Sequence, residues 1–383
     1  MIIEIPKKRL DKVDEIAIHN GFTLTEIKPS YTTKIDPFHP EEKILVIKNY
    51  KKNILNKKSN EPEMLYYDKP IFLNKKNSVI PKNYKKVGLD IIGIQNSIAE
   101  ALIINTSLKI LKEEGYDNLL VDLNCVGDKE SISKFTDETK IYYKKNYDLL
   151  NTTCKKCLNK NNNIFFLDCD HQNCRAIQEN APRPINFLTE KSKQHFKEIL
   201  EYLEGMNVPY RINDSLMSED NHYSKTIFEI KMETENKNNI EEIILARGGR
   251  YDESANKIAN KRNLSVAGVS LMFKKIKNEK AYSNQIMKPK IFLIQFGFMA
   301  RIKSFEVIDI LRQNKITIYQ NLHLEKLTDQ FDMARKMGIP NVIVIGHQEA
   351  QDNAVAFRNI KEATHEIIKI EKITQYLRKI NII

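Results

Sequence analysis

The chain has 383 residues, a formal net charge of +11, 41% hydrophobic residues and 29% charged residues. This length allows two or three domains with cores of their own, and the composition is typical of a globular protein. The apolar runs are far shorter than the roughly 18 residues of a membrane span, and no signal-peptide pattern follows Met1, so we expect no membrane association.

The positive charge is concentrated near the N-terminus. Between Lys43 and Asp90 there are 12 lysines against Glu61, Glu63, Asp68 and Asp90, a net charge of +8. A basic block of this kind can hold a phosphate backbone. Because only 12 of the 61 basic residues in the chain are arginine, a compositional bias towards lysine explains the block equally well.

The first predicted elements are a helix at Lys8–Asn20, which Gly21 ends, and a strand at Phe22–Ile27. Strands are predicted at 65–73 and 87–93. A helix with apolar residues at helical spacing is predicted at 97–114, and a strand at 119–123. We interpret Cys125, which follows this strand, as a small buried residue rather than a nucleophile.

Four of the five cysteines lie within 21 residues, in the pattern C-x2-C-x11-C-x4-C. Paired thiolates at this spacing can complete a tetrahedron around one zinc ion, which predicts a structural site with all positions filled. The predicted zinc ligands are Cys154, Cys157, Cys169 and Cys174. The alternative is a set of reduced cysteines in a small polar subdomain. Either interpretation fits a reducing cytoplasm better than a disulfide framework.

Two apolar runs with central glycines follow after an amphipathic helix at 191–205. The first, from Ile243, ends in Gly248-Gly249-Arg250-Tyr251-Asp252, and the second is Val266–Leu271. Glycines leave room for a ligand, so these runs predict strands that line a pocket, although an ordinary tight turn would have the same pattern.

The last hundred residues have a different pattern. A polar linker at 277–290 precedes alternating strands and helices, which predict a small α/β domain with helices on a mostly parallel sheet. We therefore expect two domains, 1–287 with a cysteine-rich insertion at 151–180, and 288–383.

The GGRYD turn and the following VAGVSL strand resemble the histidyl-tRNA synthetase family. The resemblance extends over most of the chain and includes Leu65–Leu73, Asn124–Asp128 and Tyr223–Glu229. It implies an α+β class II synthetase-type domain, an antiparallel sheet with flanking helices, followed by a small α/β anticodon-binding-type domain. It also implies a small-ligand pocket that includes Asp90, Tyr223, Gly248, Gly249, Arg250, Tyr251 and Asp252.

The family's adenylation residues are replaced in this chain. Its arginine in motif 2 falls at Leu73, its catalytic arginine at Ser218, and its γ-phosphate arginine at Lys275. Its R-P-E-G-T glutamate, which binds the amino group of histidine, has Val46–Tyr50 as the nearest counterpart, without a carboxylate. Since adenylation depends on these charges, the sequence favours a protein with no catalytic residues.

Three functions follow from the resemblance. The first is a catalytically degenerate paralogue that binds tRNA or another RNA, with Lys75, Lys76, Lys85 and Lys86 on phosphates. The second is an active histidine–tRNA ligase that uses ATP and Mg²⁺. The third is a regulatory module like that of ATP phosphoribosyltransferase, which the extra C-terminal domain disfavours. The motif 1-like segment Gly21–Pro29 implies a homodimer.

Overall fold

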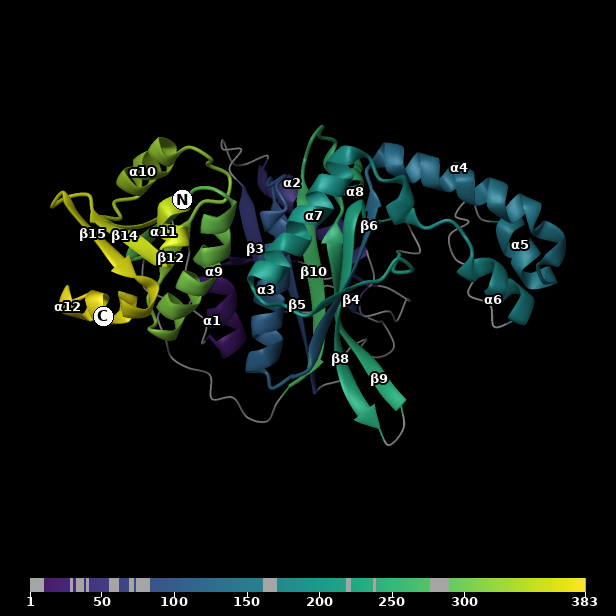
Figure 1. The fold of residues 1–383 in the computed structure, drawn as a ribbon, viewed down its shortest axis with the longest axis horizontal. Coiled ribbons are helices and arrows are strands. Elements are labelled where there is room, and N and C mark those ends of the chain that lie inside the picture. Colours follow the sequence, from purple (N-terminus) through teal and green to yellow (C-terminus); the bar gives the residue numbers. More distant parts are fainter. Residues whose placement is uncertain are drawn as a thin grey trace.

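The computed structural model describes residues 10–27, 30–31, 38, 41–54, 62–68, 72–73, 83–160, 171–217, 222–236, 239–275 and 289–382. They form a larger unit around an eight-stranded sheet and a C-terminal unit around a five-stranded sheet, which lie side by side (Figure 1). None of the described helices has the length and apolar character that a membrane crossing requires.

The eight-stranded sheet is mixed. Its order is β1 (Thr23–Leu24), β3 (Glu63–Tyr67), β5 (Tyr84–Ile92), β10 (Val266–Lys274), β9 (Asn239–Arg250), β8 (Lys225–Asn236), β6 (Leu119–Gly127) and β7 (Tyr210–Ile212). The inner strands run antiparallel as predicted, while β1 and β7 are parallel to their neighbours at the two edges. A separate short pair joins β2 (Ser30–Tyr31) and β4 (Phe72–Leu73).

Helices cover both faces of this sheet. α1 (Lys12–His19), α3 (Ile98–Glu113) and α7 (Glu190–Gly205) share one core, while α2 (Glu41–Ile54) and α8 (Asp252–Ala259) share another. Successive side chains of strand β3 alternate between the two cores: Tyr66 belongs to the first core, and Leu65 and Tyr67 belong to the second. Successive side chains of a strand point to opposite faces, so this period of two separates the two layers.

The N-terminal helix begins later than the sequence predicts. Asp11 accepts a hydrogen bond from the Asp14 amide, and the Asp14 carboxylate accepts one from the Asp11 amide. This capping box satisfies the free amides of the first turn and sets the start of α1 at Lys12.

The predicted insertion lies at the end of the molecule away from the C-terminal unit (Figure 1). Within 151–180 it contains α5 (Thr152–Lys160) and α6 (Gln172–Glu179). The elements α4 (Lys129–Lys145) and η1 (Tyr147–Leu149) precede it, and η2 (Pro184–Phe187) follows it. In the same view β8 and β9 extend beyond the rest of the sheet as a two-stranded ribbon.

The C-terminal unit has the predicted α/β alternation. Its sheet order is β12 (Ile318–Gln320), β11 (Ile291–Gln295), β13 (Asn341–Ile345), β14 (Ala354–Asn359) and β15 (Thr364–Lys369). The first three strands are parallel and the last two antiparallel. The helical elements are α9 (Phe298–Gln313), α10 (Leu327–Lys336), α11 (His347–Gln351), η3 (Ile370–Lys372) and α12 (Ile373–Lys379).

The two units share buried contacts. Ile302, Phe305 and Leu322 of the C-terminal unit belong to the same buried cluster as α1, α3 and α7. Lys109 of α3 pairs with Asp309 of α9, with 2.8 Å between Nζ and Oδ2. A shared core fixes the position of one sheet relative to the other. The boundary predicted at 287/288 falls beside residues outside the description and stays a prediction, with β10 ending at Lys274 and β11 starting at Ile291.

Candidate ligand pocket

The two glycine-containing runs are neighbouring strands. Gly268 of β10 lies opposite Gly249 of β9, and Val269 lies opposite Gly248. The sequence therefore located the centre of the sheet correctly.

The space at these glycines is occupied by the protein itself. A Cβ at Gly268 would lie 1.8 Å from Asp90 Oδ1, and one at Gly248 would lie 2.6 Å from the ring of Phe228. At Gly249 the nearest atoms are Thr226 O at 2.3 Å and the ring of Tyr223 at 2.8 Å. The glycines thus admit internal side chains, and Asp90 in particular depends on Gly268.

Lys43 fills the position in front of Asp90. Its side chain comes from α2 and is 1% exposed. The ammonium lies 3.0 and 3.1 Å from the two Asp90 oxygens and donates to Val269 O at 2.9 Å. It also lies 3.2 Å from the hydroxyl of Tyr67. An ammonium has three protons to donate, and here the oxygens of Asp90, Val269 and Tyr67 surround it as acceptors.

Glu42 supports the same arrangement from the preceding position of α2. Its Oε1 accepts from the hydroxyl of Tyr67 at 2.8 Å and from the hydroxyl of Ser270 at 2.7 Å. Its Oε2 pairs with the ammonium of Lys86, which is also buried. Tyr251 completes the enclosure by donating to Asp90 Oδ1 at 2.6 Å.

The site is electrically balanced within itself. Burial raises the pKa of Asp90 to about 6, against the opposing effects of Lys43 and of the Tyr251 hydrogen bond. Burial also disfavours the Glu42 carboxylate, but the charges of Lys86 and Lys43 outweigh it and lower the pKa of Glu42. At neutral pH the site therefore contains two carboxylates and two ammonium groups, with no charge left over for a ligand.

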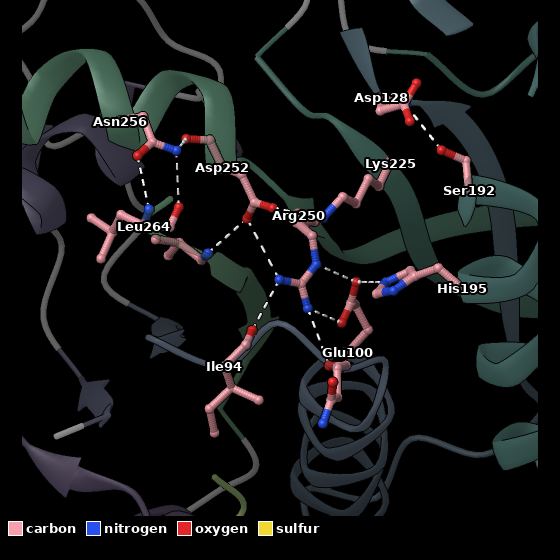
Figure 2. A network of polar contacts seen from close by, with 12 residues as sticks. Ile94, Glu100, Asp128, Ser192, His195, Lys225, Arg250, Asp252, Asn256 and Leu264 are labelled. Atoms are coloured by element: carbon pink, nitrogen blue, oxygen red, sulfur yellow. Dashed lines mark hydrogen bonds and ion pairs between the residues drawn. The ribbon is translucent and has the colours of Figure 1, made fainter. Parts of the chain in front are cut away.

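Arg250 belongs to a different network, on the α3 side of the sheet (Figure 2). It is fully buried, and its Nε and Nη2 donate to the two oxygens of Glu100 at 2.7 and 2.5 Å. His195 of α7 lies 2.7 Å from the same Glu100. Burial raises the pKa of Glu100, but the charges of Arg250 and His195 outweigh this effect and lower it well below the ordinary value.

This placement corrects the prediction that Arg250 lines the pocket. Arg250 is the last residue of β9 and donates to Glu100 of α3, whereas Tyr251, which caps α8, donates to Asp90. Asp252 is also structural, because its Oδ1 accepts from the amide of Val266 at 2.8 Å and its Oδ2 pairs with Lys225 at 3.0 Å.

Tyr223 does lie beside the predicted pocket. It is 5% exposed and belongs to the same buried cluster as Tyr251. His222 packs between them, stacked on the ring of Tyr251 with a centroid separation of 5.5 Å and edge-on to Tyr223 at 5.4 Å. The structure therefore brings Asp90, Tyr223 and Tyr251 together as one packed group.

Two of the four lysines predicted to bind RNA are internal. Lys86 pairs with Glu42, and Lys85, 8% exposed, pairs with Asp11. They cannot reach a phosphate backbone from these positions, so we withdraw their assignment. Lys75 and Lys76 lie outside the described residues, as does Ser218 and the side chain of Leu73.

The sequence interpretation missed Glu42 and Lys43. It aligned the family's R-P-E-G-T segment with Val46–Tyr50, which the structure places inside α2. A nearer match lies just before, where residues 39–43 read H-P-E-E-K. The shared proline and glutamate were the available signal. In that alignment Glu41 takes the position of the family's glutamate, so the expectation that no carboxylate is present there is wrong. Glu42 and Lys43 replace the glycine and threonine of the family.

The cysteine motif is described in part. Cys154 of α5 and Cys174 of α6 are buried in one small cluster with Tyr143, Leu150 and Ile177. Cys174 Sγ accepts from the amide of Asn151 at 3.3 Å. The side chain of Cys157 and the whole of Cys169 lie outside the described residues, within which no three potential metal ligands come together.

Comparison with known proteins agrees with the fold. An anticodon binding domain model matches residues 299–380. A histidine–tRNA ligase of Caldicellulosiruptor saccharolyticus is 27% identical over 301 residues, which cover 78% of this chain and 70% of that protein. One from Staphylococcus aureus (strain Newman) is 24% identical over 347 residues, covering 89% and 81% of the two chains.

A solved structure of apo histidyl-tRNA synthetase from S. aureus superposes with a TM-score of 0.52 and 19% identity. The match covers 98% of this chain and 99% of that one, and it confirms the fold. The sequence relatives and the C-terminal domain match agree with it: the chain is similar to histidine–tRNA ligases over most of its length, and its C-terminal unit is similar to an anticodon binding domain.

Proposed function

We propose that this protein binds tRNA but does not activate histidine. The observation that supports the proposal most directly is the enclosed ammonium of Lys43, which lies between Asp90, Tyr67 and Val269 O. The family resemblance assigns Asp90 to the small-ligand pocket. Here its carboxylate is already neutralised by a group of the same chain.

A free amino acid would have to displace this group. Removing one partner of a buried ion pair costs on the order of 3 to 5 kcal/mol, because the other charge stays buried and unpaired. The tethered ammonium loses no translational freedom, whereas a ligand does. Competition within the pocket therefore favours Lys43 strongly.

The replaced arginines agree with this interpretation. Leu73 and Ser218 offer no positive charge to the phosphates of ATP, and Lys275 lacks the bidentate geometry of arginine. Each lost contact of this type costs roughly 3 kcal/mol of transition-state stabilisation. The competing proposal, an active ligase that uses ATP and Mg²⁺, requires other residues to supply these charges.

What supports RNA binding is the match of residues 299–380 to the anticodon binding domain and the family's link to tRNA through relatives named histidine–tRNA ligase. The segment near the N-terminus offers less positive charge to RNA than the sequence count suggests, because Lys43, Lys85 and Lys86 are buried and paired with carboxylates of the same chain. We propose that Lys75 and Lys76 contribute the phosphate contacts of this segment.

We predict that histidine-dependent exchange of pyrophosphate into ATP stays at background. The purified protein is assayed with histidine, ATP and Mg²⁺, with an active histidine–tRNA ligase as the positive control. A rate within about a hundredfold of common enzyme turnover would show that the chain is an active enzyme.

We predict that tRNA binding weakens steeply with salt. Substituting Lys75→Gln and Lys76→Gln together should reduce the log–log salt slope by about 1.4 to 1.8, because each phosphate contact contributes roughly 0.7 to 0.9. The matched control is Lys134→Gln with Lys193→Gln, two exposed lysines on helices elsewhere.

An unchanged slope in the Lys75 and Lys76 variant would show that these lysines are solvated surface without an RNA role. Lys86→Gln provides a second comparison. Because Lys86 is buried beside Glu42, we expect this variant to unfold at lower urea concentration while any folded fraction keeps the parental salt slope.

We also propose a homodimer. The segment from Gly21 forms the edge strand β1, whose outer side has no partner strand in the described sheet. An edge of this kind can pair with its own copy around a twofold axis. Light scattering at micromolar concentration should give twice the chain mass of 44.7 kDa, and a monomer would contradict the proposal.

We propose a structural zinc ion at Cys154, Cys157, Cys169 and Cys174, in a protein of the reducing cytoplasm. In support, the first and last of these cysteines are buried together, and an amide donates to the sulfur of Cys174. Zinc would supply folding energy to the insertion, with no part in chemistry.

We predict one zinc per chain by elemental analysis. Cys174→Ser should lose the metal, and the buried Cys125→Ser, outside the motif, should keep it. Full zinc content in the Cys174 variant, or none in the parent, would refute the site.

A further inference from the structure

A cavity of about 590 Å³ lies where the two units meet. One wall is the loop that follows β5, from Gly93 to Asn96, together with Asn263. The other wall is the loop from Leu322 to Lys326 and the first turn of α10. The volume is in the range of roughly 300 to 1,000 Å³ that is typical of small-ligand sites, which often occur at domain interfaces.

The walls of this junction cavity are held firmly. Arg250 donates to Ile94 O at 3.0 Å and to Asn96 O at 3.3 Å, so the buried arginine network fixes the first wall (Figure 2). On the second wall, Asn321 Oδ1 accepts from the amides of His323 and Leu324, both at 2.8 Å. A site with fixed walls binds a ligand without the entropy cost of ordering its loops.

The lining is rich in amides and almost balanced in charge. Gln95 and Asn263 each carry a donor and an acceptor side by side, while the amide of Asn96 donates to Glu325 Oε1 at 3.4 Å. Among the lining residues, Lys326 opposes Glu325 and Asp329, which leaves a net charge of −1 with His323 neutral. An excess of carboxylates disfavours phosphate, whereas paired amides match the edge of a nucleobase.

The second wall comes from the edge of the α/β unit. β12 is the edge strand of the five-stranded sheet, and the loop that leaves its carboxyl end forms this wall of the cavity.

We propose that the junction cavity receives one unstacked nucleobase of the bound RNA. The amide of Asn263 binds the edge of the base, and the amide of Asn96 exchanges its long hydrogen bond to Glu325 for a second contact to that edge. The exposed ring of His323 stacks on the face of the base. This inference rests on the proposed binding of RNA. The cavity would add a specific contact to one base, whereas the lysines contact only phosphates.

The test uses the full chain and a histidine tRNA transcript. The variant combines Asn96→Ala with Asn263→Gly. Asn263 has a φ of +64°, a conformation that glycine adopts freely, so the second change removes the amide without straining the backbone. The control combines Asn118→Gly, at φ +51°, with Asn180→Ala, both exposed and absent from the cavity lining.

Fluorescence anisotropy at several salt concentrations measures both affinity and salt slope. We expect the cavity variant to bind about tenfold more weakly with an unchanged slope, since a lost base contact changes no phosphate contact. The control should match the parent. A transcript containing 4-thiouridine should crosslink to the peptide that contains His323.

The outcomes separate this inference from the proposed function. If the parent binds tRNA and the cavity variant binds equally well, without a crosslink at His323, the cavity has no role and RNA binding stands. A reduced salt slope in the cavity variant would also overturn the inference, because it would indicate phosphate contacts. If the parent binds no tRNA, both proposals fail together.

Discussion

The enclosed ammonium of Lys43 is the interaction on which the pocket depends. It is 1% exposed and lies within 3.1 Å of both oxygens of a fully buried carboxylate, Asp90. Neither group could stay buried without the other at an acceptable free energy. The surrounding sequence is adapted to this pair, since Gly268 leaves room for Asp90 and Gly88 leaves room for the ring of Tyr67. Asp90, Tyr223 and Tyr251, which the resemblance assigns to a small-ligand pocket, are buried in the core of this protein.

The other face of the same strands supports a different feature. Arg250, next in sequence to the pocket residue Tyr251, connects β9 to Glu100 of α3 and to the loop at Ile94 and Asn96. That loop is one wall of the junction cavity, and the shared core with α9 fixes the opposite wall. The enclosed ion pair of Lys43 and Asp90 and the framework that positions the two units therefore lie on opposite faces of the same strands.

Much of the fold could be predicted from the sequence, because apolar periodicity and the glycine-containing strands are local signals. The pairing of β9 with β10 and the α/β order after Ile291 are examples. Side-chain direction could not be predicted from the residues alone. Arg250 points away from the pocket to Glu100 of α3, and Lys85 and Lys86 look like surface charges until Asp11 and Glu42 approach from distant segments. Long-range pairing of this kind leaves no trace in a count of charges.

The most direct test of this account is isothermal titration calorimetry of histidine with the native protein and with a Lys43→Ala, Glu42→Gly variant. Circular dichroism first confirms that the variant is folded. We predict no saturable heat with the native chain at millimolar histidine, because Lys43 already pairs with the carboxylate of Asp90, which we propose would otherwise face the ligand. Saturable binding of one histidine per native chain would contradict the account, since it would show that the pocket opens despite the buried ion pair.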